Sequence, residues 1–236
     1  MKIVAANFKT NHTRKLVNEY IVTVDGFIKD NNYNNDIYIF PSLTSLDRFD
    51  TSSNLNIGVQ NAYNALKGSY TGEVGSLQLD EFDIKTILIG HSERREFFNE
   101  EQDLIVDKFK YYANLGYKII YCIGEPLEVK EDGYEEILDY LFTQLEGIDI
   151  LYDNLVIAYE PVWAIGTGAI ASIEDIQNIH NSLKEKIEKP ILYGGSVNVN
   201  NIENILSINS VDGVLVGSAS LDKEDFCSMI KISNNI

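Results

Sequence analysis

Eight short apolar runs, spaced along the whole chain, constrain its fold more than any other feature. They occupy Ile3–Lys9, Asp36–Ser42, Asn56–Ala62, Thr86–Ser92, Lys118–Glu125, Leu155–Pro161, Pro190–Ser196 and Gly213–Ala219. Their starts lie 20 to 37 residues apart, and most of these gaps can hold a helix with two loops. The apolar residues are nearly continuous rather than alternating, which is typical of strands buried on both faces in a parallel sheet.

Helical patterns lie between these runs. Ser172 is a candidate N-cap for an apolar-periodic segment that follows it. Asn99 and Gln102 resemble a capping box, and Gly116 marks the end of the helix that they would open. The alternation of strand and helix patterns predicts an α/β protein.

Eight strand–helix units in 236 residues predict a (β/α)₈ barrel that forms a single domain, residues 1–236. The alternative is a doubly wound open sheet, which usually carries a glycine-rich fingerprint after its first strand. The first predicted strand of this chain ends instead in NFKTN. The barrel is therefore the favoured architecture.

The charge balance disfavours two classes of partner. The chain has 36 acidic and 19 basic residues, a formal net charge of −17, which disfavours binding to nucleic acid or to an anionic membrane.

Cys122 and Cys227 form neither a CxxC pair nor a His/Cys cluster, which favours a reducing compartment without structural zinc. The apolar stretch Ile3–Ala6 is too short for a signal-peptide core, and no run is long enough to span a bilayer. We expect a cytoplasmic protein.

Reactive side chains gather at the C-terminal ends of the predicted strands, where the sites of barrel enzymes are built. In chain order these ends carry Asn7, Lys9, Gln60, Asn61, His91, Ser92, Glu125, Glu160, Gly194–Ser196, Gly217 and Ser218. A cation, an imidazole, carboxylates and two glycine-rich turns would thus meet at one rim. This set can supply a base, an electrophile and a cradle for an anion.

Five motifs along the chain resemble the triosephosphate isomerase family, the family of the TIM barrel. They are NFK, GHSERR, AYEPVWAIGTGAIAS, YGGSV and GVLVGSASL, in that order and across the whole chain. The resemblance implies a glycolytic and gluconeogenic isomerase that interconverts dihydroxyacetone phosphate and D-glyceraldehyde 3-phosphate through an enediol(ate). It also implies that neither a cofactor nor a metal takes part.

The resemblance implies a role for each of four catalytic residues. Glu160 would be the base that moves a proton between adjacent carbons, although an acid at a strand end can also be a rim salt-bridge partner. His91 would be a neutral electrophile, where a structural histidine is the alternative. Lys9 and Asn7 would bind substrate and stabilise the enediolate.

Supporting residues follow His91. SERR has the pattern of a helix start, with Ser92 as cap and Glu93 in the first turn. Glu93 is expected to pair with Lys9; the alternative is a surface acid at a helix start.

Phosphate binding is assigned to three segments by the same resemblance. Pro161–Ala171 would be a closing lid, in which the backbone of Gly166 reaches the phosphate. Ser196, Gly217 and Ser218 would complete the cradle with backbone N–H groups, which bind a dianion without arginine. Ser218 departs from the family pattern, which commonly has glycine there.

The loop Tyr63–Gly72 is long for a compact domain, and such loops usually serve function. In the family this loop inserts into a neighbouring subunit, so we expect a homodimer in which Thr71 approaches the partner's site. A self-packed loop in a monomer is the alternative. Lys184, where an arginine is usual, would weaken any bidentate pairing with Asp212.

Two other functions stay open at this point. One is a different phosphate-binding barrel enzyme, such as a lyase that uses Lys9 as a Schiff base. The other is a barrel that serves mainly as a binding or surface-interaction protein.

Overall fold

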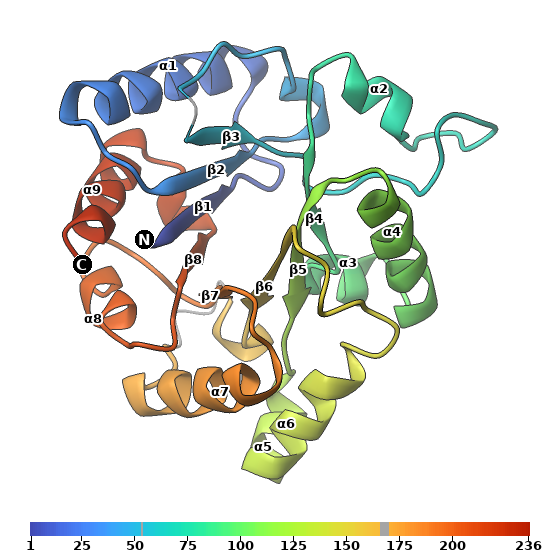
Figure 1. Cartoon of the computed structure of the whole chain (residues 1–236), viewed down its shortest axis with the longest axis vertical. Helices are drawn as coiled ribbons and strands as arrows, with labels where there is room; N and C mark the ends of the chain where they lie inside the picture. Colours follow the sequence, from blue (N-terminus) through green and yellow to red (C-terminus); the bar gives the residue numbers. More distant parts are fainter. Residues whose placement is uncertain (53, 166–169) are drawn as a thin grey trace.

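Eight parallel strands form the centre of the molecule (Figure 1). The structure is a computed structural model that describes residues 1–52, 54–165 and 170–236. The strands are β1 (Ile3–Asn7), β2 (Asp36–Phe40), β3 (Leu55–Ile57), β4 (Thr86–Ile89), β5 (Lys118–Ile123), β6 (Leu155–Tyr159), β7 (Ile191–Tyr193) and β8 (Gly213–Val216). Their order in the sheet is β3-β2-β1-β8-β7-β6-β5-β4.

The two edges of this sheet meet just beyond the end of β3. Val59 forms a parallel bridge with Ile87 of β4. The Val59 N–H donates to Thr86 O and the Leu88 N–H donates to Val59 O, each at 2.9 Å. The sheet is thus a nearly closed barrel, which confirms the predicted (β/α)₈ architecture and excludes the open sheet.

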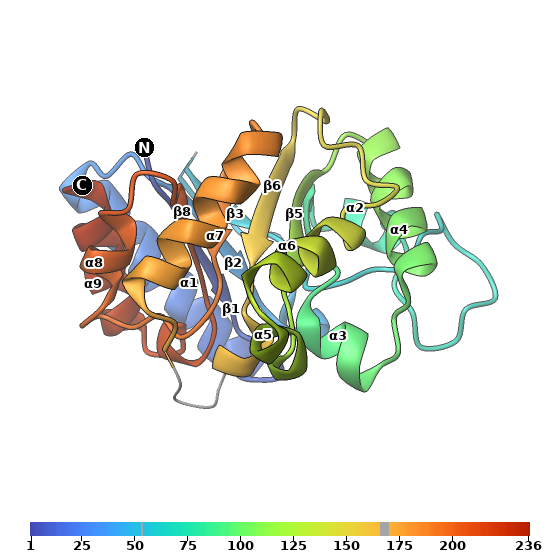
Figure 2. The same ribbon diagram turned by 90° about the horizontal axis from the view of Figure 1, so that it is seen from below.

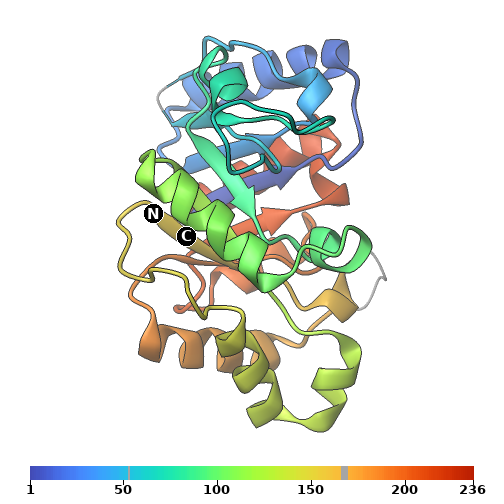
Figure 3. The ribbon, with the colours of Figure 1, turned by 90° about the vertical axis from the view of Figure 1, so that its right-hand side faces the viewer.

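Helices surround the strands, as Figure 1 shows. They are α1 (Arg14–Asn31), α2 (Ser76–Asp80), α3 (Ser92–Phe97), α4 (Gln102–Asn114), α5 (Leu127–Asp132), α6 (Tyr134–Thr143), α7 (Ile173–Lys186), α8 (Ile202–Leu206) and α9 (Lys223–Asn234), with 3₁₀ turns η1 (Leu43–Ser45), η2 (Val162–Ala164) and η3 (Ser218–Ser220). In Figure 3, α4 lies across the outside of the barrel, in contact with β4 and β5. Among the residues that the structure describes, no helix combines the length and apolar character needed to cross a bilayer.

The core has two shells, because side chains of a strand alternate between its faces. A larger cluster packs between strands and helices. The inner cluster, which fills the barrel, comprises Ile3, Ala5, Tyr38, Phe40, Leu88, Ile120, Cys122, Val156, Ala158, Leu192 and Leu215. Continuing the same alternation by one step reaches Asn7, Glu160 and Gly217, so the inward positions at the strand ends are predicted site residues.

The helix starts agree only in part with the sequence. Ser172 caps α7, since its side chain accepts from the Asp175 N–H. The predicted Asn99 cap is wrong: the N-cap of α4 is Glu101, and Asn99 has a positive φ of 52°. The side-chain oxygen of Gln102, which a capping box needs as an acceptor, instead accepts from Arg95 Nη1 at 3.0 Å.

Strand direction decides where a site can form. In Figure 2, β6 points toward the side of the molecule that carries α3 and α5, while both termini lie at the opposite side. The C-terminal strand ends therefore share one rim.

Candidate active site

A cavity of about 240 Å³ lies at this rim. Its walls include seven residues that the sequence analysis named: Asn7, Lys9, His91, Glu160, Ser196, Gly217 and Ser218. They come from the ends of five strands, β1, β4, β6, β7 and β8. The fold therefore brings the predicted base, imidazole, cation and glycine-rich turns to one space.

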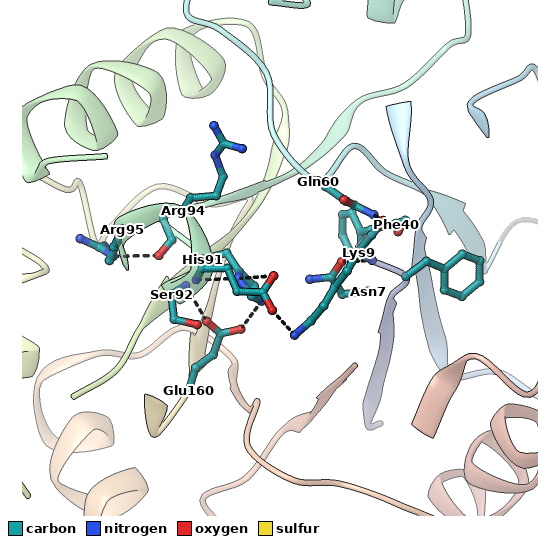
Figure 4. A network of polar contacts seen from close by, with 12 residues as sticks. Asn7, Lys9, Phe40, Gln60, His91, Ser92, Arg94, Arg95 and Glu160 are labelled. Carbon is teal, nitrogen blue, oxygen red and sulfur yellow. Dashed lines mark hydrogen bonds and ion pairs between the residues drawn. The ribbon is translucent and has the colours of Figure 1, made fainter. Parts of the chain in front are cut away.

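Glu160 follows directly after β6 and is 2% exposed. Its Oε1 lies 3.3 Å from His91 Nε2, and its Oε2 accepts from the Ser92 N–H at 3.2 Å (Figure 4). Two glycines make room for it. A Cβ at Gly124 would lie 1.8 Å from Glu160 O, and one at Gly194 would lie 2.8 Å from Glu160 Cγ. Neither position accepts a larger residue unless the base moves.

His91 is the N-cap of α3, which corrects the prediction that Ser92 fills this place. The ring Nδ1 accepts from the Glu93 N–H at 3.2 Å, while Ser92 is the first helical residue. An imidazolium has no free lone pair, so only the neutral ring makes this bond, and its proton is on Nε2. That N–H faces Glu160 and the cavity. The His91 ring, not the Ser92 hydroxyl, therefore accepts the hydrogen bond from the unpaired N–H at the start of the helix.

Lys9 has an unusual backbone with a positive φ of 52°. Such a conformation costs of order 1–3 kcal/mol in a residue other than glycine, so neighbouring groups must hold it. Its N–H donates to Asn7 Oδ1 at 3.1 Å. Its Nζ forms an ion pair with Glu93, and the two side chains are 23% and 34% exposed. The expected Lys9–Glu93 contact is present, and the ammonium lies at the cavity wall.

Gln60 has a contact that the sequence did not indicate. Its side-chain Nε2 donates to Lys9 O and to Phe40 O, both at 2.9 Å. The sequence places Gln60 at a strand end without a role, because only the fold brings these two carbonyls together.

The expected phosphate end is formed by the turns after β7 and β8. Ser218 begins η3, and Gly217 precedes it. A side chain is thus tolerated at Ser218, since the backbone there is helical. The Ser196 hydroxyl donates to Ala164 O at 2.6 Å, and Asn201 Nδ2 donates to Ser196 O at 2.9 Å. The first bond holds the β7 turn against the segment after β6, and the second joins that turn to the start of α8, a contact that the sequence analysis missed.

The predicted lid is described only at its two ends, and Gly166 lies outside the described residues. At the first end, Trp163 Nε1 donates to Glu125 Oε1 at 2.7 Å. The Tyr159 hydroxyl donates to the same oxygen at 3.2 Å. Burial raises the pKa of Glu125, while these donors oppose the shift. A buried carboxyl thus fixes the start of this segment beside the cavity.

The segment Tyr63–Gly72, called the arm below, extends away from the barrel in Figures 1 and 2. Leu66 and Tyr70 are 52% and 46% exposed, and Thr71 is also exposed. Within one chain the structure does not bring Thr71 to the cavity.

The second departure from the family pattern lies at the other end of the barrel. Lys184 Nζ lies 2.5 Å from Asp212 Oδ2 and also donates to Lys189 O at 2.9 Å. An ion pair with Asp212 therefore forms, through a single ammonium rather than a guanidinium fork.

Comparison with known proteins gives one consistent result. The family model described as "Triosephosphate isomerase" matches residues 2–233. The triosephosphate isomerase of Sulfurimonas denitrificans is 52% identical over 234 residues, covering 99% of this chain and 97% of that protein. The protein of that name from Wolinella succinogenes is 55% identical over 229 residues, covering 97% and 99%. The one from Helicobacter hepaticus is 47% identical over 235 residues, covering 99% and 100%.

Proposed function

The chain belongs to the triosephosphate isomerase family, and we propose that its rim cavity interconverts dihydroxyacetone phosphate and D-glyceraldehyde 3-phosphate through an enediolate. One observation carries this proposal. A buried carboxylate, the Nε2–H of a neutral imidazole and a lysine ammonium line the same cavity of about 240 Å³.

Glu160 is the proposed base. Moving a hydrogen between adjacent carbons needs one group that takes the proton from the first carbon and returns it to the second. Both carboxylate oxygens of Glu160 are held by the His91–Ser92 segment. A substrate that displaces these contacts would find the carboxylate already at the cavity wall. The proton returns to substrate, so no net charge builds up over a turnover.

His91 and the β1 residues are proposed to handle the developing charge. The Nε2–H of His91 donates to the substrate carbonyl oxygen and moves protons between the two oxygens. The Lys9 ammonium and the Asn7 amide stabilise the enediolate. The Lys9 ammonium forms an ion pair with Glu93, an arrangement that suits electrostatic stabilisation better than Schiff-base formation.

Phosphate binding is assigned to the turns at Ser196, Gly217 and Ser218, with Gly166 of the lid as a further donor. Distant acids do not prevent this, because physiological salt screens charges beyond about 8–10 Å. A closed lid would keep water from the enediolate, which would otherwise lose its phosphate. The Trp163–Glu125 contact gives that lid a fixed starting point.

The proposal extends to assembly and location. We propose a homodimer formed through the arm, in which Thr71 of each chain approaches the partner's cavity. The exposed Tyr70 and Leu66 on the arm and Phe97 and Phe98 at α3, each 65% exposed, offer apolar surface for such an interface. We place the reaction in the cytoplasm, where the two free cysteines would stay reduced.

The test is a coupled assay of triose phosphate isomerisation by the purified protein. Wild type should turn over both substrates without added metal or cofactor, and Glu160→Gln should lose nearly all activity. Absence of turnover by wild type would refute the proposed function. Borohydride reduction in the presence of substrate tests the lyase: covalent trapping at Lys9 would favour it.

A further inference from the structure

The strained backbone of Lys9 is held from both sides. Its N–H donates to Asn7 Oδ1, and its carbonyl accepts from Gln60 Nε2 at 2.9 Å. Asn7 belongs to the cavity, but Gln60 comes from the segment after β3 and lies on the other side of Lys9 from the ion pair with Glu93 (Figure 4). The positive φ of Lys9 is thus fixed by side-chain amides rather than by the strand ladder.

Gln60 is suited to this task by its two N–H groups. The same Nε2 also donates to Phe40 O at 2.9 Å, so both hydrogens of the amide are used. Phe40 O additionally accepts from the Phe8 N–H at 3.1 Å, which ties β2 to the residue before Lys9. The amide therefore anchors Lys9 to the end of β2, a rigid part of the barrel.

Other side chains of similar length lack this ability. Methionine has no donor, and a glutamate carboxylate would direct acceptor oxygens at two carbonyl oxygens. In either case the Lys9 carbonyl would lose its fixed partner, and the favoured conformation of a non-glycine residue at negative φ would become accessible. The ammonium at the tip of the side chain would move with the backbone.

We propose that Gln60 is a positioning residue for Lys9: it holds the left-handed backbone that places the ammonium where the phosphate-bearing enediolate forms. This inference rests on the proposed function. Gln60 acts only through Lys9 and touches no reacting atom. Removing the Gln60 amide should therefore lower activity and ligand binding as much as misplacing Lys9 does. When Lys9 itself has been replaced, removing the amide should lower ligand binding no further.

The experiment is a double-mutant cycle with Gln60→Met and Lys9→Met. We measure kcat and KM for isomerisation, and the dissociation constant of 2-phosphoglycolate by calorimetry. The matched control is Asn56→Leu. The amide of Asn56, four residues earlier, also bridges two backbone carbonyls, Ile37 O at 3.3 Å and Asn54 O at 3.4 Å, but away from Lys9.

Gln60→Met should lower kcat/KM about 10- to 100-fold, the scale of a displacement near 1 Å. It should also weaken 2-phosphoglycolate binding severalfold. In the Lys9→Met background the same change should alter 2-phosphoglycolate binding less than about twofold, because coupled residues are not additive. Asn56→Leu should keep kcat/KM within about twofold of wild type. Gln60→Glu, which replaces the N–H donors with acceptor oxygens, should lower kcat/KM at least as much as Gln60→Met.

Three outcomes would overturn the inference. They are wild-type kinetics in Gln60→Met, an equal loss in Asn56→Leu, and a full further loss of 2-phosphoglycolate binding on adding Gln60→Met to Lys9→Met. Each leaves wild-type turnover intact and so leaves the proposed function standing. An inactive wild type refutes the proposed function instead, and the binding cycle still decides whether Gln60 acts through Lys9.

Discussion

Shortening the proposed base by one methylene group, Glu160→Asp, is the sharpest test of the site geometry. The glutamate carboxylate lies 3.3 Å from His91 Nε2 and 3.2 Å from the Ser92 N. Loss of one carbon–carbon bond withdraws the carboxylate by about 1.5 Å. A misplacement of about 1 Å can cost 10²-fold. We therefore expect kcat to fall about 10²- to 10³-fold, which is about 3–4 kcal/mol of activation free energy.

The proposed phosphate contacts do not involve Glu160, so KM should stay within about threefold of wild type. The coupled isomerase assay measures both constants, with Glu160→Gln as the control that keeps the length and removes the base. An Asp variant with undiminished kcat would take Glu160 out of the mechanism. A large rise in KM with unchanged kcat would show that the residue binds substrate rather than moves its proton.

Three further predictions concern phosphate, assembly and pH. Ser218→Gly should weaken the binding free energy of the inhibitor 2-phosphoglycolate by at most about 0.5–1.5 kcal/mol, the value of one hydrogen bond. Ser218→Asp should weaken it far more, because a carboxylate would face the dianion. Equal inhibition constants in all three proteins would place the residue outside the cradle. Shortening the arm should give monomers with little activity, as judged by sedimentation, and a fully active wild-type monomer at micromolar concentration would contradict the dimer. Burial lowers the pKa of His180 from 6.5 to about 4, so the unfolded chain binds the proton first and the free energy of unfolding should fall by about 3 kcal/mol as the pH drops from about 6.5 to about 4. Urea unfolding of wild type and of His180→Gln across this range measures the fall in unfolding free energy. An equal fall in both proteins would show that the His180 ring is not its cause.

The barrel was predictable because strand patterns and helix patterns alternate along the chain. Each of the eight predicted runs contains a strand or lies within one residue of its start. The runs extend past the strands at their polar ends, most clearly for Asn56–Ala62, where β3 ends at Ile57. Those extra residues, such as Glu160 and Ser196, follow the strands and line the cavity, and the Glu160 N–H still donates to Ile123 O of β5 at 2.7 Å. The polar ends of the runs therefore indicate where the candidate site begins.

The local contacts of the site were harder to predict. Ser92 has a better capping side chain than His91 by general preference, yet the helix begins at Ser92 and its cap is His91, whose ring accepts the Glu93 N–H. Gln60 shows the same limit, because its partners lie 20 and 51 residues away in the chain. Sequence patterns describe an element's own face, whereas these contacts depend on which elements the closed barrel places side by side.

The closure of the barrel has a consequence for its motions. Between β3 and β4 the ring is joined at an isolated bridge, at Val59, whereas the other neighbouring strands pair over two to five residues. This seam stands immediately before Gln60 and the arm begins four residues after Val59. Local opening of this seam would free the Lys9 carbonyl from Gln60. A partner chain bound to the arm would keep the seam closed. Amide hydrogen exchange should therefore be fastest among the strands at Val59 and Leu88, and it should slow if the proposed dimer forms, which would then protect the position of Lys9 from a distance.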